Sequence, residues 1–315
     1  MNEMGNAEIM LNQAQPLLER DEPGDDGRVL VGLDIGGTKT EVLIVDRQLA
    51  PLAQISRPTD ASGPAGLVES VAATASEALA QAGREKSDIL AIGIAVPGLV
   101  EPEAGVVRLA VNLNLVTYPL GQAISELFAA PCQLENDVRA GAMGALRYAN
   151  RQETIRHLAY LSIGTGIAAG VILDGRLYRG ANGMAGEIGH VIMEPGGARC
   201  GCGMPGCLEA VAAGPAVARL GGLWLGSAAY DPALTTRDVY AAATRGDGNA
   251  VRIVDQVSAY YARAIQLLVM AYDVEKVALG GGVSRAGMAF LRPILDALAD
   301  LRAESNLAQA MLPDE

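Results

Sequence analysis

Apolar residues along this chain fall into short continuous runs, which predict strands buried on both faces. The clearest of these runs span residues 29–35, 89–96 and 274–279. Elsewhere apolar residues recur at helical spacing, and glycines mark where helices end. We expect helices over residues 64–82, 120–129, 137–150, around 208–220, 236–245 and 249–272, with another starting near residue 284 and a short strand at 132–134.

Two pairs of strands are joined by glycine-rich tips of the same kind. Gly36-Gly37-Thr38 leads from the first run into an expected returning strand at 41–46, and Gly164-Thr165-Gly166 divides the apolar stretch 158–173. Glycine lets backbone N–H groups approach an anion closely, threonine adds a hydroxyl, and Lys39 adds a positive charge. Taken alone, the first tip could equally be a plain turn with a solvated lysine. Its recurrence indicates an internal repeat with one phosphate-binding hairpin in each half.

Composition narrows the fold and the class of partner. Half of the 315 residues are apolar but only two are Phe, so the core must consist of Ala, Val, Ile and Leu, which suits packed parallel sheet and helices. The net charge of −12 argues against nucleic acid as the main partner, because a phosphate backbone attracts clustered Lys and Arg. No uninterrupted run of 18 apolar residues occurs, so we expect no membrane contact, and the few cysteines fit a reducing cytoplasm.

Residues 186–209 hold the densest group of reactive side chains. They include one of the chain's two histidines, His190, and three of its four cysteines, Cys200, Cys202 and Cys207. Zn²⁺ takes four tetrahedral ligands, typically Cys and His, so this set would close a site without a water position, as structural sites are closed. The alternative is that the thiols are small buried side chains or part of a disulfide, but Cys200 and Cys202 are poorly spaced for bonding to each other.

Polar side chains stand where strands end. Asp34 closes the first buried run, where a carboxylate can hold a metal ion or its water. Glu135, Asn136 and Asp137 follow a short strand, and α/β folds bind ligands at the C-terminal ends of their strands. Asn136 or Asp137 could also cap the next helix, which does not exclude catalysis. After the last strand, residues 280–282 are glycines, which permit a flat adenine or ribose to lie against bare backbone, with a flexible loop as the alternative.

Four separated motifs occur in one order: D-I-G-G-T-K-T (34–40), E-N-D (135–137), G-E-I-G-H with C-G-C-G-M-P-G-C-L-E (186–209), and G-G-G-V (280–283). Together they resemble the ROK family, named for repressors, open reading frames and kinases, which includes bacterial glucokinases and N-acetylmannosamine kinases. The resemblance covers about residue 28 to the C-terminus. It implies an α/β protein of the actin-like ATPase (ribonuclease H-like) fold, with two α/β domains around a central cleft.

We place these domains at residues 28–130 and 131–315. Residues 1–27 end in a charged run rich in Pro and Gly and are expected to be a disordered tail. Family members usually continue into a closing C-terminal helix, which this sequence is expected to lack.

The resemblance also implies roles for the matching residues. The expected reaction is ATP-dependent phosphorylation of a hexose, usually at the 6-hydroxyl, with Asp137 as general base. The substrate-binding residues would be Gly98, Asn112, Asn136, Asp137, Glu187, His190 and Glu209. The residues beside ATP and Mg²⁺ would be Asp34, Gly36, Gly37, Thr38, Lys39, Gly164, Thr165, Gly166, Gly281 and Gly282. Structural Zn²⁺ would be held by His190, Cys200, Cys202 and Cys207, and the expected assembly is a homodimer or homotetramer.

One departure from the family pattern lies beside the expected sugar site. Family kinases usually carry an N-L-P-G-W type run, whereas residues 112–120 read N-L-N-L-V-T-Y-P-L. Asn114 replaces the proline and Val116 the tryptophan, so the choice between glucose, the leading expectation, and an N-acetylhexosamine stays open. A sugar-sensing regulator without catalysis is the alternative outside enzymes, although the tail at 1–27 is too short for a winged helix-turn-helix.

Overall fold

The computed structural model describes residues 27–151, 153–224 and 233–304. These residues form two compact units. Unit 1 takes the described residues up to Thr154 together with Gly180–Gly183, and unit 2 takes Ile155–Arg179 together with the described residues from Met184 onward. All but the last residue of the expected tail lies outside the described residues, and the division into domains at residue 130 stays a prediction.

Unit 1 is built on a mixed five-stranded sheet in the order β3-β2-β1-β4-β8. Its strands are β1 (Val29–Ile35), β2 (Lys39–Val45), β3 (Pro51–Pro58), β4 (Ile89–Val96) and β8 (Cys132–Asn136). β1, β4 and β8 run parallel, and the register places Asp34 beside Ala95 and Ala95 beside Glu135. The C-terminal ends of these three strands therefore meet at one edge of the sheet, which is the usual ligand edge in α/β folds.

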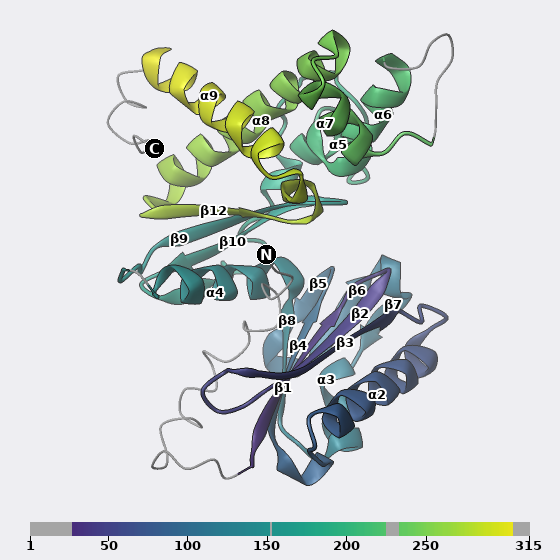
Figure 1. The fold of residues 1–315 in the computed structure, drawn as a ribbon. Coiled ribbons are helices and arrows are strands. Elements are labelled where there is room, and N and C mark those ends of the chain that lie inside the picture. The colour runs from purple at the N-terminus through teal and green to yellow at the C-terminus, as the bar shows by residue number, and fades with distance from the viewer. Residues whose placement is uncertain (1–26, 152, 225–232, 305–315) are drawn as a thin grey trace. The chain divides into compact units, whose positions relative to one another are not determined.

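Helices cover both faces of this sheet (Figure 1). On one face, α2 (Pro64–Gln81) and α3 (Leu120–Phe128) share a core with β4, in which Leu67 and Ile124 join Ile94. On the other face, α4 (Asp137–Ala149) packs through Ala140 against Ala95. Strands covered on both faces need no polar side, which explains why their sequences are continuous apolar runs.

A second sheet in unit 1 has three short antiparallel strands, β5 (Leu99–Glu101), β6 (Val106–Ala110) and β7 (Leu115–Tyr118). The 3₁₀ turn η4 (Val111–Leu113) connects β6 to β7 and carries Asn112. Leu113 and Leu115 are fully buried in the core of unit 1, whereas Val116 is 70% exposed. This sheet was not predicted from the sequence, because its strands are short and only partly apolar.

Unit 2 has a four-stranded sheet in the order β11-β10-β9-β12. The strands are β9 (Leu158–Ile163), β10 (Ile167–Leu173), β11 (Arg176–Tyr178) and β12 (Lys276–Gly280). Figure 1 shows its helices gathered on one side of this sheet, namely α5 (Leu208–Ala212), α6 (Gly214–Trp224), α7 (Thr236–Thr244), α8 (Gly248–Tyr272) and α9 (Met288–Glu304). One apolar core joins helices and strands, with Tyr261 of α8 completely buried in it. The internal repeat was expected from two glycine hairpins, and each unit contains one of them.

Most expected elements agree with the structure to within a residue or two, and three differ in an informative way. The helical stretch around 208–220 is broken at Ala213, whose backbone is extended. The helix expected near residue 284 begins as the 3₁₀ turn η6 (Gly282–Ala286), and α9 follows only after Gly287, which has a φ of 63°. The returning strand β2 begins at Lys39 rather than at residue 41.

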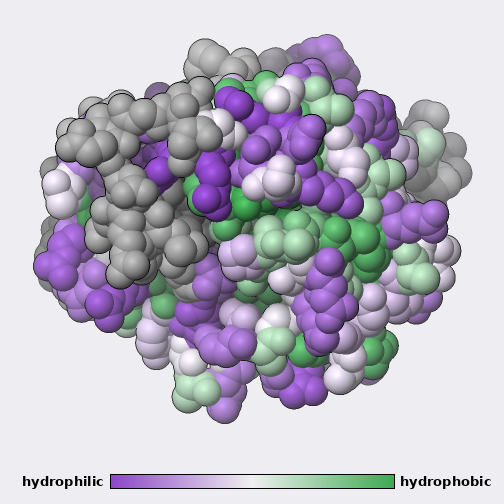
Figure 2. All heavy atoms as spheres, turned by 90° about the horizontal axis from the view of Figure 1, so that it is seen from below, coloured by the Kyte–Doolittle hydropathy of each residue, from purple (hydrophilic) through white to green (hydrophobic). Residues whose placement is uncertain are grey.

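The described surface is mixed in character. Figure 2 shows one face, on which purple hydrophilic residues surround smaller green hydrophobic areas. Scattered exposed apolar side chains of this kind are normal for globular proteins. Within the described ranges, no helix combines the length and the apolar character that a membrane span requires.

Candidate functional site

The E-N-D motif lies where β8 passes into α4. Asn136 is the N-cap of α4, and its Oδ1 accepts hydrogen bonds from the N–H groups of Val138 at 3.0 Å and Arg139 at 3.2 Å. Its Nδ2 donates to the carbonyl oxygen of Gly98 at 3.2 Å. The capping role considered for this motif is therefore confirmed for Asn136, and Asp137 becomes the first residue of the helix.

A buried ion pair between Glu135 and Arg139 holds the E-N-D motif in place. Glu135 and Arg139 are each 6% exposed, and Arg139 Nη1 lies 3.7 Å from Glu135 Oε1. The same Oε1 accepts a hydrogen bond from the N–H of Asn136 at 2.9 Å, and Arg139 Nη2 donates to the carbonyl oxygen of Gly183. Losing one partner of such a pair would leave an uncompensated buried charge, so the arrangement holds this corner in one geometry.

Asp137 has the clearest acid–base property of the site. Burial raises the pKa of its carboxyl to about 6, and the negative charge of Asp34 acts in the same direction. The N–H of Val138 donates to Asp137 Oδ1 at 2.9 Å and acts in the opposite direction. A position in the first turn of a helix also favours the charged form, so burial is the stronger influence here. A carboxylate with a pKa near 6 is suited to accept a proton near neutral pH.

The first glycine hairpin lies at the same sheet edge. Gly36 N–H donates to the carbonyl oxygen of Lys39 at 2.9 Å and closes the turn, with Gly37 and Thr38 exposed at its tip. A Cβ on Gly37 would lie 2.8 Å from Cβ of Asn112, so Asn112 packs directly against the tip. The side chain of Lys39 reaches Glu41, with Nζ 2.7 Å from Oε2.

Gly98 closes this part of the site. It adopts a φ of 93°, and a Cβ on it would collide with the carbonyl oxygen of Leu109. Only glycine fits such a position without shifting β6. Unit 1 thus brings together the expected residues Asp34, Gly36, Gly37, Thr38, Lys39, Gly98, Asn112, Asn136 and Asp137.

The second glycine hairpin joins β9 to β10 in unit 2. Gly164 N–H donates to the carbonyl oxygen of Gly166 at 2.9 Å, and Thr165 is exposed at the tip. Gly164 also accepts a hydrogen bond from Gly214 N–H at 2.8 Å, so the start of α6 is attached to the hairpin. A Cβ on Gly164 would lie 3.6 Å from the backbone nitrogen of Gly282, which places η6 beside the same tip.

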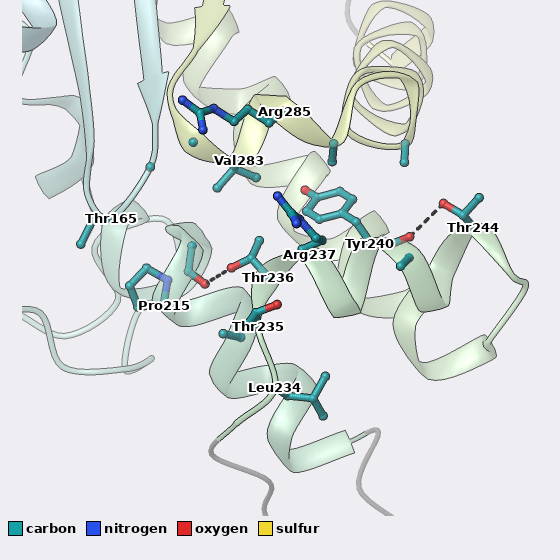
Figure 3. A pocket seen from close by; sticks show the side chains of 17 residues that line it. Thr165, Pro215, Leu234, Thr235, Thr236, Arg237, Tyr240, Thr244, Val283 and Arg285 are labelled. Carbon is teal, nitrogen blue, oxygen red and sulfur yellow. Dashed lines mark hydrogen bonds between the residues drawn. The ribbon is translucent and has the colours of Figure 1, made fainter. Parts of the chain in front are cut away.

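A cavity of about 780 Å³ opens beside this hairpin. Figure 3 shows Thr165 and Pro215 at one end and Tyr240, Thr244, Val283 and Arg285 on the other walls. Thr235, Thr236 and Arg237, from the start of α7, also line it. Thr236 Oγ1 donates to the carbonyl oxygen of Gly214 at 2.7 Å, which joins α7 to α6.

Most of this cavity was not predicted from the sequence. The hairpin and Gly282 were expected at the site, whereas Arg237 and Arg285 were not. The helix starting at Thr236 was predicted, yet nothing in its sequence indicates that its first turn faces a hairpin some 70 residues earlier. Gly281 and Gly282, expected beside the nucleoside, follow the end of β12 and lead into η6, and Gly281 has a φ of 86°.

The cysteines and His190 converge in unit 2. One ligand atom from each of His190, Cys200, Cys202 and Cys207 lies within 4.8 Å of all the others. Cys200 Sγ is 3.6 Å from His190 Nδ1, and Cys202 Sγ is 3.6 Å from Cys207 Sγ. All four cysteines are free thiols, so the disulfide alternative does not hold.

Two carboxylates adjoin this cluster. Glu187 is the N-cap of the 3₁₀ turn η5 (Ile188–His190), and its Oε2 lies 3.9 Å from Nε2 of His190, the last residue of that turn. His190 therefore turns one ring nitrogen toward the cysteines and the other toward a carboxylate. Glu209, in the first turn of α5, accepts a hydrogen bond on Oε2 from Ile167 N–H at 3.1 Å.

Comparison with known proteins covers nearly the whole described chain. The model of the ROK family matches residues 30–310. A glucokinase of Halalkalibacterium halodurans is 33% identical over 278 residues, which are 85% of this chain and 84% of that protein. The DNA-binding transcriptional dual regulator NagC of Escherichia coli is 30% identical over 215 residues, 67% of this chain and 53% of the regulator.

Solved structures agree with the sequence match. A ROK family glucokinase from Streptomyces griseus, in complex with glucose and AMPPNP, is 27% identical and has a TM-score of 0.71, covering 87% of this chain and 89% of that one. The actin-like ATPase fold expected from the four motifs is thereby confirmed. Because the family model spans both units and all four motifs, the chain belongs to the ROK family.

Proposed function

We propose that this chain, an ATP-dependent sugar kinase, phosphorylates a hexose at its 6-hydroxyl, that D-glucose is the substrate, and that Asp137 is the general base. The observation that carries the proposal is the Asp137 carboxyl, held at the ligand edge of the unit 1 sheet with its pKa raised by burial to about 6. A base with this pKa is ionised at neutral pH and still binds a proton well enough to assist the transfer.

In the proposed reaction the oxygen of the sugar hydroxyl attacks the γ-phosphorus of ATP. The hydroxyl proton passes to the Asp137 carboxylate, and ADP leaves with the electrons of the broken P–O bond. Phosphoryl transfer requires mainly positioning and neutralisation of charge from the protein, together with one group that orients the nucleophile. The anchored N-cap Asn136 and the Glu135–Arg139 pair hold that group in place.

The two glycine hairpins are proposed to hold the phosphates, and the cavity of unit 2 to hold the nucleoside. Their exposed tips present backbone N–H groups and the hydroxyls of Thr38 and Thr165. The cavity volume of about 780 Å³ suits a nucleotide-sized ligand, and Arg237 and Arg285 bring positive charge to it. Mg²⁺ prefers carboxylate and phosphate oxygens, so Asp34 at the end of β1 is its proposed protein contact.

The His/Cys cluster is proposed to hold Zn²⁺. In a tetrahedral site with ordinary Zn–S and Zn–N bond lengths, neighbouring ligand atoms lie about 3.6 to 3.8 Å apart. The observed separations of 3.6 Å for the Cys202–Cys207 and Cys200–His190 pairs match that geometry. When bound, the ion would supply structural support, because four protein ligands leave no position for a reacting water. Glu187, His190 and Glu209 are the proposed sugar contacts beside it.

One feature favours an N-acetylhexosamine as a second candidate substrate. Val116, which replaces the tryptophan usual in family kinases, is 70% exposed, so it forms no bulky wall. Asn114, which replaces the proline, adopts a φ of 52° that proline cannot adopt. The loop that follows Asn112 therefore has its own conformation, and a larger substituent on the sugar is compatible with it.

A coupled ADP-release assay over glucose, mannose, fructose, N-acetylglucosamine and N-acetylmannosamine tests these proposals. Turnover with glucose at the highest kcat/KM supports the primary proposal, and turnover with an N-acetylhexosamine alone supports the second. If a folded, sugar-binding protein turns over none of them, catalysis is excluded and a sugar-sensing regulator is favoured. Mass spectrometry of the product after periodate cleavage identifies the phosphorylated hydroxyl.

A further inference from the structure

Ile167 directly follows the second glycine hairpin. Residues of the stretch 186–209 contact both its backbone N–H and its carbonyl oxygen. Ile167 N–H donates to Glu209 Oε2 at 3.1 Å. A Cβ on Gly189 would collide with the carbonyl oxygen of Ile167, so the turn that carries Glu187 and His190 lies directly against it. The side chain of Ile167 is buried in the unit 2 core together with Ile188. The end of the hairpin thus cannot shift without moving the proposed sugar contacts.

The start of the hairpin is attached to the same segment of chain. Gly164 accepts from Gly214 N–H at 2.8 Å, and Gly214 begins α6 directly after α5, which carries Glu209. The segment from Glu209 to Gly214 therefore contacts both ends of the hairpin. The break at Ala213 is consistent with this contact, because in one continuous helix the N–H of Gly214 would bond to the carbonyl oxygen of Ala210 and not to that of Gly164.

Space around Glu209 is limited on the hairpin side. A Cβ on Gly166 would lie 2.5 Å from Glu209 Oε2, far inside van der Waals contact. Gly166 does not adopt a positive φ, so its backbone would accept an L-residue. The absent side chain at Gly166 is thus required by the carboxylate and not by the turn.

We propose that Glu209 is a positioning residue that links the two substrates, accepting a hydrogen bond from the phosphate hairpin and one from the sugar at the same time. A carboxylate has two oxygens and about four acceptor positions, so the bond from Ile167 N–H leaves capacity for a sugar hydroxyl. A sugar bound to Glu209 fixes the carboxylate, and the fixed carboxylate holds the hairpin in its phosphate-binding form. This inference rests on the proposed function, in which Glu209 contacts the sugar and Gly164–Gly166 contact ATP.

Linkage requires the effect to be reciprocal, so bound sugar raises nucleotide affinity by the same factor as bound nucleotide raises sugar affinity. Couplings of this kind typically amount to about 5- to 150-fold. We expect the affinity for AMPPNP to rise at least about fivefold when the sugar is saturating. In Glu209→Ala the affinity for AMPPNP should be nearly the same with and without saturating sugar.

The decisive variant is Gly166→Ala, because its methyl group must displace the Glu209 carboxylate. Displacement is possible without unfolding, since the atom that moves is the end of a flexible side chain. Isothermal titration with D-glucose and with N-acetylmannosamine, without nucleotide, should show a loss of sugar affinity of about tenfold, the loss expected of one hydrogen bond to a charged group. A mutation in the phosphate hairpin would then weaken binding of the other substrate.

Gly248→Ala, at the start of α8 and outside the proposed sites, is the control for a glycine-to-alanine change. A Cβ on Gly248 would meet no atom within 4 Å, so the sugar affinity of this variant should equal that of the wild type. The double variant Gly166→Ala/Glu209→Ala should bind sugar no more weakly than Glu209→Ala alone, because the group displaced by the methyl is already gone. Thermal unfolding midpoints verify that each variant is folded.

The outcomes separate this inference from the proposed function. Wild-type sugar affinity in Gly166→Ala, equal losses in Gly166→Ala and Gly248→Ala, or an additive loss in the double variant would each overturn the link through Glu209 while leaving the kinase reaction intact. A folded wild type that binds neither sugar overturns both proposals. Selective loss of sugar affinity in Gly166→Ala, absent in the Glu209→Ala background, supports the link.

Discussion

The pKa of the Asp137 carboxyl is shifted in opposite directions by different parts of its surroundings. As the first residue of α4 it receives a hydrogen bond from Val138 N–H and lies at the positive end of the helix, both of which favour the charged carboxylate. Burial and the neighbouring charge of Asp34 favour the neutral acid, and they prevail, with a pKa of about 6. The ionised base is therefore available at neutral pH but not far below it.

The pH dependence of the reaction follows from this pKa. We expect kcat/KM for the sugar, measured at saturating MgATP, to be level above pH 6 and to fall about tenfold per pH unit below it, because protonated Asp137 cannot accept the hydroxyl proton. Asp137→Asn should lower kcat by about 10²- to 10⁴-fold and lose this limb of the profile while retaining sugar binding.

The raised pKa of Asp137, which suits it to act as a base, also lowers the stability of the fold at neutral pH. A carboxyl whose pKa is raised by folding binds its proton more tightly in the native state, so its ionisation destabilises the fold as the pH rises through about 6. Asp137→Asn should therefore be at least as stable as the wild type at pH 7 by thermal unfolding. Undiminished turnover in this variant, or a profile without inflection near pH 6 in the wild type, would contradict the assignment of the base.

At the scale of elements, helix starts are specified by local side chains. Asn136 caps α4, Thr235 and Asp238 form a capping box at α7, and Asp247 caps α8 by accepting from the N–H groups of Asn249 and Ala250 at 3.0 and 2.9 Å. Of these caps only the one at α4 was considered from the sequence, although in all three the cap and its helix are neighbours along the chain. The predicted starts of these three helices accordingly lie within a residue of the observed ones.

The cap of α8 offers a test outside the proposed sites. Asp247→Ala should destabilise unit 2 by about 1 kcal/mol, because two backbone donors lose their partner, and lower its thermal midpoint by about 2 to 4 °C. Asp247→Asn keeps an acceptor oxygen and should lose much less. Differential scanning calorimetry of both variants makes the comparison, and equal losses would mean that the charge, and not the cap, matters at this position.

Elements whose limits depend on distant residues were predicted less well. The division of 208–220 into α5 and α6 accompanies contacts of Glu209 and Gly214 with a hairpin more than 40 residues earlier. The strands β5, β6 and β7 are individually too short to be recognised, and they are stable only because they pair with one another. Periodicity within a short window contains no information about such partners.

At the scale of the whole molecule, the zinc proposal makes the broadest prediction. Purified protein should contain about one Zn²⁺ per chain by plasma mass spectrometry, and Cys207→Ser should contain well under one. Since structural zinc contributes directly to folding, this variant and chelator-treated wild type should both unfold at lower temperature. Cys132→Ser is the matched control, because Cys132 lies outside the cluster, and it should keep its metal. A wild type purified without zinc, yet fully stable, would refute the site.

Local sequence was sufficient to predict the buried strands, most helix limits, the two glycine hairpins and the residue types of the His/Cys cluster. Each of these depends on neighbours along the chain: a continuous apolar run, a cap, a turn, or ligands within 18 residues of one another. Four such motifs in one order were enough to indicate the ROK family, which the comparisons confirmed.

The contacts between these features could not be predicted from local sequence and are seen only in the folded chain. The raised pKa of Asp137 requires burial beside Asp34, which comes from another strand of the sheet. The cavity walls from α7 and η6, and the bond between Glu209 and Ile167, join segments that are far apart in sequence. Burial and long-range contacts arise when the core packs, and the spacing of residues along one segment does not encode them. For this reason the residue types of the site could be predicted from the sequence, whereas the contacts that join its segments could not.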